Sequence, residues 1–81
     1  MKLIEIKYES QTISSVLINI NKIETIYHSY KSIRLWLSSK AFWTIDFETE
    51  IDAKKSYADI ITFMNYGPDP ADGVLRFSSK S

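Results

Sequence analysis

The clearest structural signal in the chain is a change of hydrophobic period within residues 41–65. Up to position 48, residues alternate between two sides: Trp43, Ile45 and Phe47 on one, and Phe42, Thr44, Asp46 and Glu48 on the other. Beyond Thr49 the apolar residues recur at helical spacing: Ala53, Tyr57, Ile60, Ile61 and Met64. The pattern predicts a half-buried strand over 41–48 that leads directly into an amphipathic helix. We expect Trp43, Phe47, Ile60, Ile61 and Met64 to form the core between helix and sheet.

Strand patterns also occur before this stretch. The segments 3–8, 15–20 and 33–38 alternate, and a third strand is expected near 25–28. Ile23 and Ile26, three residues apart, indicate a single helical turn before that third strand. Residues 29–32 are polar enough to form a hairpin loop, and residues 9–12 form a further turn.

The ends of the helix carry recognisable signals. Thr49 or Asp52 is the expected N-cap, because the pair resembles a capping box. Gly67 is the expected left-handed residue after a helix that ends at 65–66, and Pro68 prevents continuation. Residues 67–73 have loop composition. The apolar run 74–77 is a possible short strand, which can pair with a sheet edge of its own chain or of a neighbour.

These segments predict an α+β fold. We expect a four-stranded antiparallel meander (β-β-β-β-α) with one C-terminal helix packed on one face, and a possible short fifth strand in the tail. Residues 1–66 would form a single domain, followed by a loop and C-terminal tail at 67–81 that contains the possible strand 74–77.

Composition narrows the functional classes. Eighty-one residues, 44% of them apolar, suffice for one small core. Without cysteine, the chain can form neither a disulfide nor a thiolate metal site. Ten basic residues balance ten acidic ones, so no overall field attracts nucleic acid or an anionic membrane. The charged N-terminal run resembles neither a signal peptide nor a membrane span, and we expect a cytoplasmic protein.

Catalytic and metal-binding patterns are weak. His28 is the only histidine, and it is more simply interpreted as a strand residue with one wet side than as a general base. Asp46, Glu48, Glu50 and Asp52 recur at every second position, which would suit a hard cation on one extended strand. The expected helix start near Thr49 turns Glu50 and Asp52 away from that line. It places them in the first helical turn, where the helix dipole favours negative charge. We therefore expect no enzyme activity, no metal site and no cofactor.

Aromatic and basic residues gather in the third and fourth strands and at the start of the next. The candidate binding residues are Tyr27, Tyr30, Lys31, Arg34, Trp36 and Phe42. Trp36 and Phe42 fall on the face opposite Leu35, which leaves them exposed if the helix covers the Leu35 side. Such a face suits a protein interface, single-stranded nucleic acid, or cover by the chain's own tail. Asp46 and Glu48 on the adjoining strand disfavour phosphate.

The favoured interpretation is a small non-catalytic protein-binding or regulatory module that acts through this exposed aromatic face. The expected partner is another protein or a second copy, with a homodimer favoured. The alternative is a protein that binds single-stranded nucleic acid. No membrane partner is expected.

The run from Val16 to Ile61 resembles the short FlbD-like flagellar proteins, in which a strand leads through an I-x-x-I-x-x-I turn to a hairpin and a short C-terminal helix. The matching positions are Ile20, Ile23, Ile26, Ile33, Leu35, Trp43, Ile45 and Ile60. All are apolar scaffold positions, so the resemblance implies a fold and assigns no site. The chain departs from the pattern by lacking an Asn-Gly hairpin and by its tail after Asn65. The expected β-β-β-β-α order is also similar to the PC4-like single-stranded DNA-binding fold.

Overall fold

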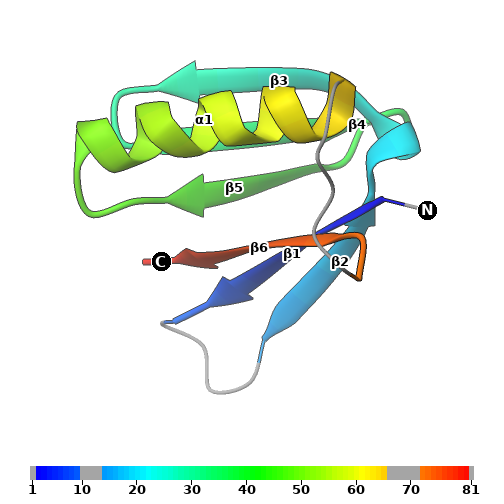
Figure 1. Ribbon diagram of the computed structural model, residues 1–81, viewed down its shortest axis with the longest axis horizontal. Helices are drawn as coiled ribbons and strands as arrows, with labels where there is room; N and C mark the ends of the chain where they lie inside the picture. The colour runs from blue at the N-terminus through cyan, green and yellow to red at the C-terminus, as the bar shows by residue number, and fades with distance from the viewer. Residues whose placement is uncertain (1, 10–13, 66–71, 81) are drawn as a thin grey trace.

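The computed structural model describes residues 2–9, 14–65 and 72–80, which form two three-stranded sheets and one helix (Figure 1). The first sheet contains β1 (Leu3–Tyr8), β2 (Ser15–Asn19) and β6 (Val74–Ser79), in the order β2-β1-β6. The second contains β3 (Ile23–Ser29), β4 (Ser32–Leu37) and β5 (Phe42–Asp46), in that order. A 3₁₀ turn, η1 (Ile20–Lys22), joins the two sheets, and α1 (Glu50–Asn65) follows β5.

The α+β class is confirmed, but the single four-stranded meander is wrong. Five strands precede the helix in the described part of the chain, and they divide between two sheets. The meander breaks after β2, where the Asn19 side chain accepts a hydrogen bond from the backbone N–H of Asn21 (2.9 Å) and stabilises η1. The helical turn therefore lies at 20–22 rather than at 23–26, and it redirects the chain into the second sheet.

The C-terminal strand completes the first sheet. It runs parallel to β1, with Leu3 opposite Val74 and Tyr8 opposite Ser79. The helix therefore lies between β5 of one sheet and β6 of the other along the chain, and it is not the last element. The possible strand at 74–77 is present and two residues longer, and it pairs with its own chain.

The two sheets also meet where β5 and β6 end. The backbone N–H of Asp46 donates to the Ser79 hydroxyl (2.9 Å), and the N–H of Lys80 donates to the Asp46 carbonyl (2.8 Å). Ser79 is completely buried at this junction. These two hydrogen bonds link the sheets and give partners to backbone groups of Asp46 and Lys80 at the ends of the two strands.

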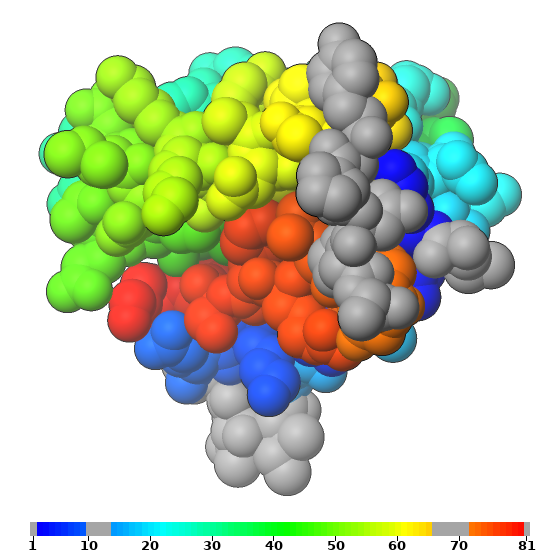
Figure 2. All heavy atoms as spheres, in the orientation of Figure 1, coloured from blue at the N-terminus to red at the C-terminus, as the bar shows by residue number. Residues whose placement is uncertain are grey.

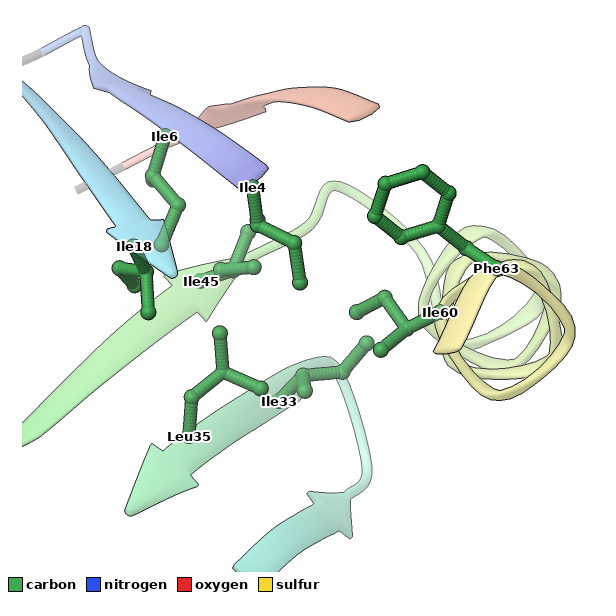
Figure 3. Close-up of a cluster of buried hydrophobic side chains, with 8 residues drawn as sticks. All are labelled: Ile4, Ile6, Ile18, Ile33, Leu35, Ile45, Ile60 and Phe63. Carbon is green, nitrogen blue, oxygen red and sulfur yellow. The ribbon is translucent and has the colours of Figure 1, made fainter. Parts of the chain in front are cut away.

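The core lies between the two sheets and the helix (Figure 3). Eight buried side chains form it: Ile4, Ile6, Ile18, Ile33, Leu35, Ile45, Ile60 and Phe63. Alternation along the strands turns their isoleucines and leucine inward, and the helix contributes Ile60 and Phe63, which lie three positions apart on one side of it. In the view of Figures 1 and 2, α1 lies above β6 on the face toward the reader.

The predicted helix–sheet core is correct only in part. Ile60 is buried, while Phe47 and Met64 pack against the cluster as partly buried neighbours. Trp43 is 37% exposed, with its ring centroid 6.3 Å from that of Tyr8, so its assignment to the core was wrong. Ile61 is half-buried and does not join the cluster.

The reason is the position of each residue around the helix. Successive residues are rotated by about 100°, so burial of Ile60 turns Ile61 toward the side of α1. Phe63, which the predicted core omitted, takes the place on the buried stripe that was assigned to Ile61.

The predictions for the ends of helices and strands agree better with the structure. The Thr49 hydroxyl accepts a hydrogen bond from the N–H of Asp52 (3.1 Å), which confirms Thr49 as the N-cap. The hairpin expected at 29–32 is also present, because Ser29 pairs with Ser32 across a two-residue loop. The loop begins with Tyr30 at φ 51°. The assignments of Gly67, Pro68 and the 9–12 turn fall wholly or mainly outside the described residues.

Candidate interaction surface

The side of β3-β4-β5 that points away from the core forms what we call the outer face. Its residues follow from the strand register and lie in three rows across the sheet: Thr25, Trp36 and Phe42; Tyr27, Arg34 and Thr44; Ser29, Ser32 and Asp46. The alternating positions between these rows include Ile33, Leu35 and Ile45, which point into the core. The outer face therefore gathers residues from three strands that are separated in the sequence.

Aromatic rings and one cation dominate the first two rows. The Trp36 and Phe42 rings contact each other with centroids 4.7 Å apart. The Arg34 guanidinium carbon lies 4.6 Å from the Phe42 centroid and 6.0 Å from that of Trp36. Phe42 is 46% exposed and Tyr27 is 56% exposed, whereas Trp36 is half-buried. The rings thus hold the guanidinium in place on a face open to solvent.

The second and third rows surround a hollow of about 300 Å³ beside this cluster. Its lining consists of Tyr27, Ser29, Ser32, Arg34, Thr44 and Asp46. The short side chains of Ser29, Ser32 and Thr44 leave this space between larger neighbours. The Ser32 hydroxyl donates to the Asp46 carboxylate (2.6 Å) and fixes the acidic wall of the hollow.

Two of the six candidate residues lie at the hairpin tip and not in these rows. The Lys31 ammonium stands 5.3 Å from the Tyr30 ring centroid, and both residues are exposed. The tip is anchored to the end of β5, because the Phe47 N–H donates to the Lys31 carbonyl (2.8 Å). The structure therefore brings Tyr27, Arg34, Trp36 and Phe42 together and sets the tip pair beside them.

The two arginines of the chain differ in their partners. Arg76 pairs with Asp72 (2.6 Å) and Glu5 (3.4 Å) on the first sheet, and the bond from Arg76 lowers the pKa of the Asp72 carboxyl. Arg34 forms no ion pair with any residue in the described part of the chain. Its donors are consequently available to a ligand, while those of Arg76 are already shared with two carboxylates.

The single histidine of the chain lies outside this surface. His28 points to the core side, stacks on Tyr57 with centroids 5.5 Å apart, and places Nε2 3.2 Å from the Tyr30 carbonyl. Within the ranges 2–9, 14–65 and 72–80, no three or more His, Asp or Glu side chains gather so that they could hold a metal ion. The same ranges contain no helix long and apolar enough to cross a membrane.

Comparison with protein-family models, curated proteins and solved structures finds no match to this chain. The resemblance to the FlbD-like flagellar proteins therefore stays a prediction.

Sequence reasoning missed the hollow and the residues that shape it. Alternation had placed Thr44 and Asp46 on the side of Phe42, but it gave no register between strands. The two-residue loop at Tyr30 and Lys31 supplies that register, because it sets Ser29 opposite Ser32 and the pairs that follow in step. Reading the hairpin as a two-residue loop could have placed Tyr27 beside Arg34.

Proposed function

We propose that the protein is a non-catalytic module that binds a protein surface through the outer face of β3-β4-β5. The observation that carries this proposal is the Arg34 guanidinium held over Phe42 and Trp36 on an exposed face, with no ion pair among the described residues. Tryptophan, tyrosine and arginine are the residues that most often dominate binding energy at protein interfaces. The partner is a second copy of this chain or another protein.

Charge favours a protein over nucleic acid. A single-stranded nucleic acid needs a positively charged groove along its backbone as well as rings for stacking. The outer face carries Arg34, with Lys31 at its border, and Asp46 forms one wall of its hollow. The chain as a whole has no net charge. A face of this kind offers apolar contact and one directed cation, which suits a protein surface better than a row of phosphates.

Binding of single-stranded nucleic acid is the second candidate, and the stacked rings are what support it. Its affinity would fall steeply as salt rises, since each neutralised phosphate releases counterions. The antiparallel β-β-β-β-α sheet of the PC4-like proteins no longer supports this candidate, because the strands divide into two sheets.

Site-specific photo-crosslinking in the cell that naturally expresses the protein tests the proposal. Phe42 is replaced by p-benzoylphenylalanine, and Leu17, exposed on the first sheet, is replaced in a matched control. We expect a light-dependent adduct at position 42 that protease degrades and nuclease leaves intact, and that is absent at position 17. The Arg34→Ala substitution should reduce the yield of the adduct at position 42. A nuclease-sensitive adduct would establish the alternative, and equal adducts at both positions would refute a specific face.

A further inference from the structure

The terminal strand β3 has one open edge. In the described part of the chain it pairs with β4 alone, while β5 at the other end of the same sheet is joined to β6 through the bond between Asp46 and Ser79. An open edge presents backbone N–H and C=O groups that the sheet itself does not pair. Such an edge can accept a further strand.

The strand register identifies the backbone groups at this edge. Residues of an antiparallel strand turn their backbone groups alternately toward one neighbouring strand and the other. The Leu37 N–H donates to the Ala41 carbonyl (2.8 Å), so Leu37 and every second residue before it in β4 face β5. The residues between them face β3, where they pair with Tyr27 and its alternate neighbours. The N–H and C=O groups of Ile26 and His28 consequently point away from β4, to the open edge.

Nothing in β3 blocks pairing at these two residues. Their backbone groups form no hydrogen bond with a described residue other than within the strand pattern of β3 and β4. Natural sheets protect open edges with lysine, other charged residues, proline or a bulge. A bulge lies between positions 23 and 25, but the stretch from Thr25 to Ser29 contains no lysine, acidic residue or proline. The edge beyond the bulge is therefore unprotected.

The helix forms a wall above this edge. α1 packs across β3 and β4 and runs alongside them in Figure 1. Its Tyr57 ring stacks on the His28 ring, with centroids 5.5 Å apart. Ile61 lies one helical turn beyond Tyr57 on the same side of α1, half-buried and outside the core cluster. A strand added about 4.8 Å from β3 would lie beside these two side chains.

These features define the occupant chemically. Only an extended backbone offers N–H and C=O groups at the spacing of those on Ile26 and His28. Residues directly opposite each other in an antiparallel pair point to the same side, so the residues opposite Ile26 and His28 would point toward α1. There an apolar side chain would contact Tyr57 and Ile61. The residues between them would lie beside the exposed Tyr27 ring and can be polar.

We propose that the open edge of β3 binds an extended segment of another protein as an added antiparallel strand, with apolar side chains at alternate positions against Tyr57 and Ile61. A second copy fits less well, because it would bring its own Ile26 and His28 to these positions. Its His28 is already stacked on its own Tyr57. The site goes beyond the proposed function, since it uses the edge of the sheet and not the Arg34 cluster.

Amide hydrogen exchange measured by NMR tests the edge. In the free protein, the N–H groups of Ile26 and His28 should exchange at least about 100-fold faster than that of Tyr27, which is bonded within the sheet. The probe is a capped peptide of alternating valine and threonine at about 1 mM, which should slow exchange at Ile26 and His28 at least about tenfold. Leu17 on β2, the terminal strand of the first sheet, is the internal control and should not change.

Three results would overturn the site. The first is an edge already protected in the free protein, and light scattering that shows a dimer would then assign the protection to self-pairing. The second is a peptide that changes nothing at Ile26 and His28. The third is equal slowing at Leu17, which would show unspecific strand addition.

N-methylated peptides test the register on the unchanged protein. When the valines face α1 in an antiparallel strand, the valine N–H groups are the ones that bond to β3. N-methylation of the valines should therefore abolish binding, whereas N-methylation of the threonines should leave the affinity within about twofold. Equal binding of both peptides would refute backbone pairing, and the reverse order would refute the proposed orientation.

A pair of α1 variants tests the wall. Ile61→Lys should weaken peptide binding at least about tenfold, because a charge replaces the apolar contact. Thr62→Lys, at the adjacent exposed position, is the matched control, and circular dichroism should show both variants folded. Ile61→Lys that binds like the wild type would refute the part assigned to α1. Arg34→Ala should leave peptide affinity unchanged while it lowers the adduct at position 42, so failure of this site and failure of the proposed function are distinguishable.

Discussion

Replacing Ile60 and Ile61 separately by alanine tests whether burial in this core controls stability. Both substitutions remove the same three carbon atoms from adjacent positions of α1, and both gain the same helix propensity, about 0.4 kcal/mol. That gain cancels in the comparison. Only the surroundings differ, since Ile60 has 0% of its surface exposed and Ile61 is half-buried outside the core cluster.

The expected size of the difference follows from these surroundings. Removal of three buried carbons from Ile60 loses about 2.4 kcal/mol of transfer free energy at about 0.8 kcal/mol per carbon. A cavity left in the core cluster adds to this, so Ile60→Ala should cost about 3–4 kcal/mol, within the usual range for buried aliphatic residues. Ile61→Ala should cost about 1–2 kcal/mol, because part of the same surface is already in water and the side chain lies outside the core cluster.

Urea denaturation followed by far-UV circular dichroism measures both variants. A domain of this size has a free energy of unfolding of about 4–12 kcal/mol, so Ile60→Ala could approach the limit of stability. Ile60→Val, which should cost about 0.5–1.5 kcal/mol, keeps the position measurable. Equal losses for the two alanine variants, with unchanged denaturant slopes, would refute the helix orientation described above.

Three further substitutions test features that the fold depends on. Ser79→Ala removes the hydroxyl that accepts from the Asp46 N–H at the junction of the sheets, and it should lower the free energy of unfolding by about 1–3 kcal/mol in a urea titration. Ser78→Ala, at the adjacent exposed position, should change it by less than about 0.5 kcal/mol. Thr49→Ala removes the N-cap and should cost about 0.5–2 kcal/mol; a smaller loss in thermal unfolding would show that the cap is dispensable. Burial, and secondarily the charge of Asp46, raises the pKa of Tyr8. The neutral phenol therefore makes its full contribution to the free energy of unfolding below about pH 10, and this contribution falls as pH rises toward the folded-state pKa. Ultraviolet titration should show a tyrosinate transition above about pH 10 that is missing in Tyr8→Phe.

The local elements of this protein follow from its sequence. Alternation fixes which strand residues face the core, because successive side chains point to opposite sides of a sheet. That rule separates Leu35, which is buried, from Trp36 and Phe42, which contact each other on the opposite side of the sheet. The Thr49 N-cap was also predictable from the sequence, since its hydrogen bond with the N–H of Asp52 spans only three residues.

Pairing between distant segments could not be read in the same way. The apolar composition of β6 suits any sheet edge, and only the assembled molecule shows it parallel to β1 and joined to β5 through Ser79. The rotation of α1, which buries Phe63 in preference to Ile61, depends on where two sheets leave space for a ring.

The candidate site shows the same division between local and long-range information. The sequence provides the alternating aromatic and basic residues, because alternation is a property of each strand alone. The hollow beside Tyr27 depends on the register between three strands, which the pattern of any one strand does not contain. Contacts between residues far apart in the chain are chosen by the packing of the whole molecule, and local sequence patterns carry little of that information.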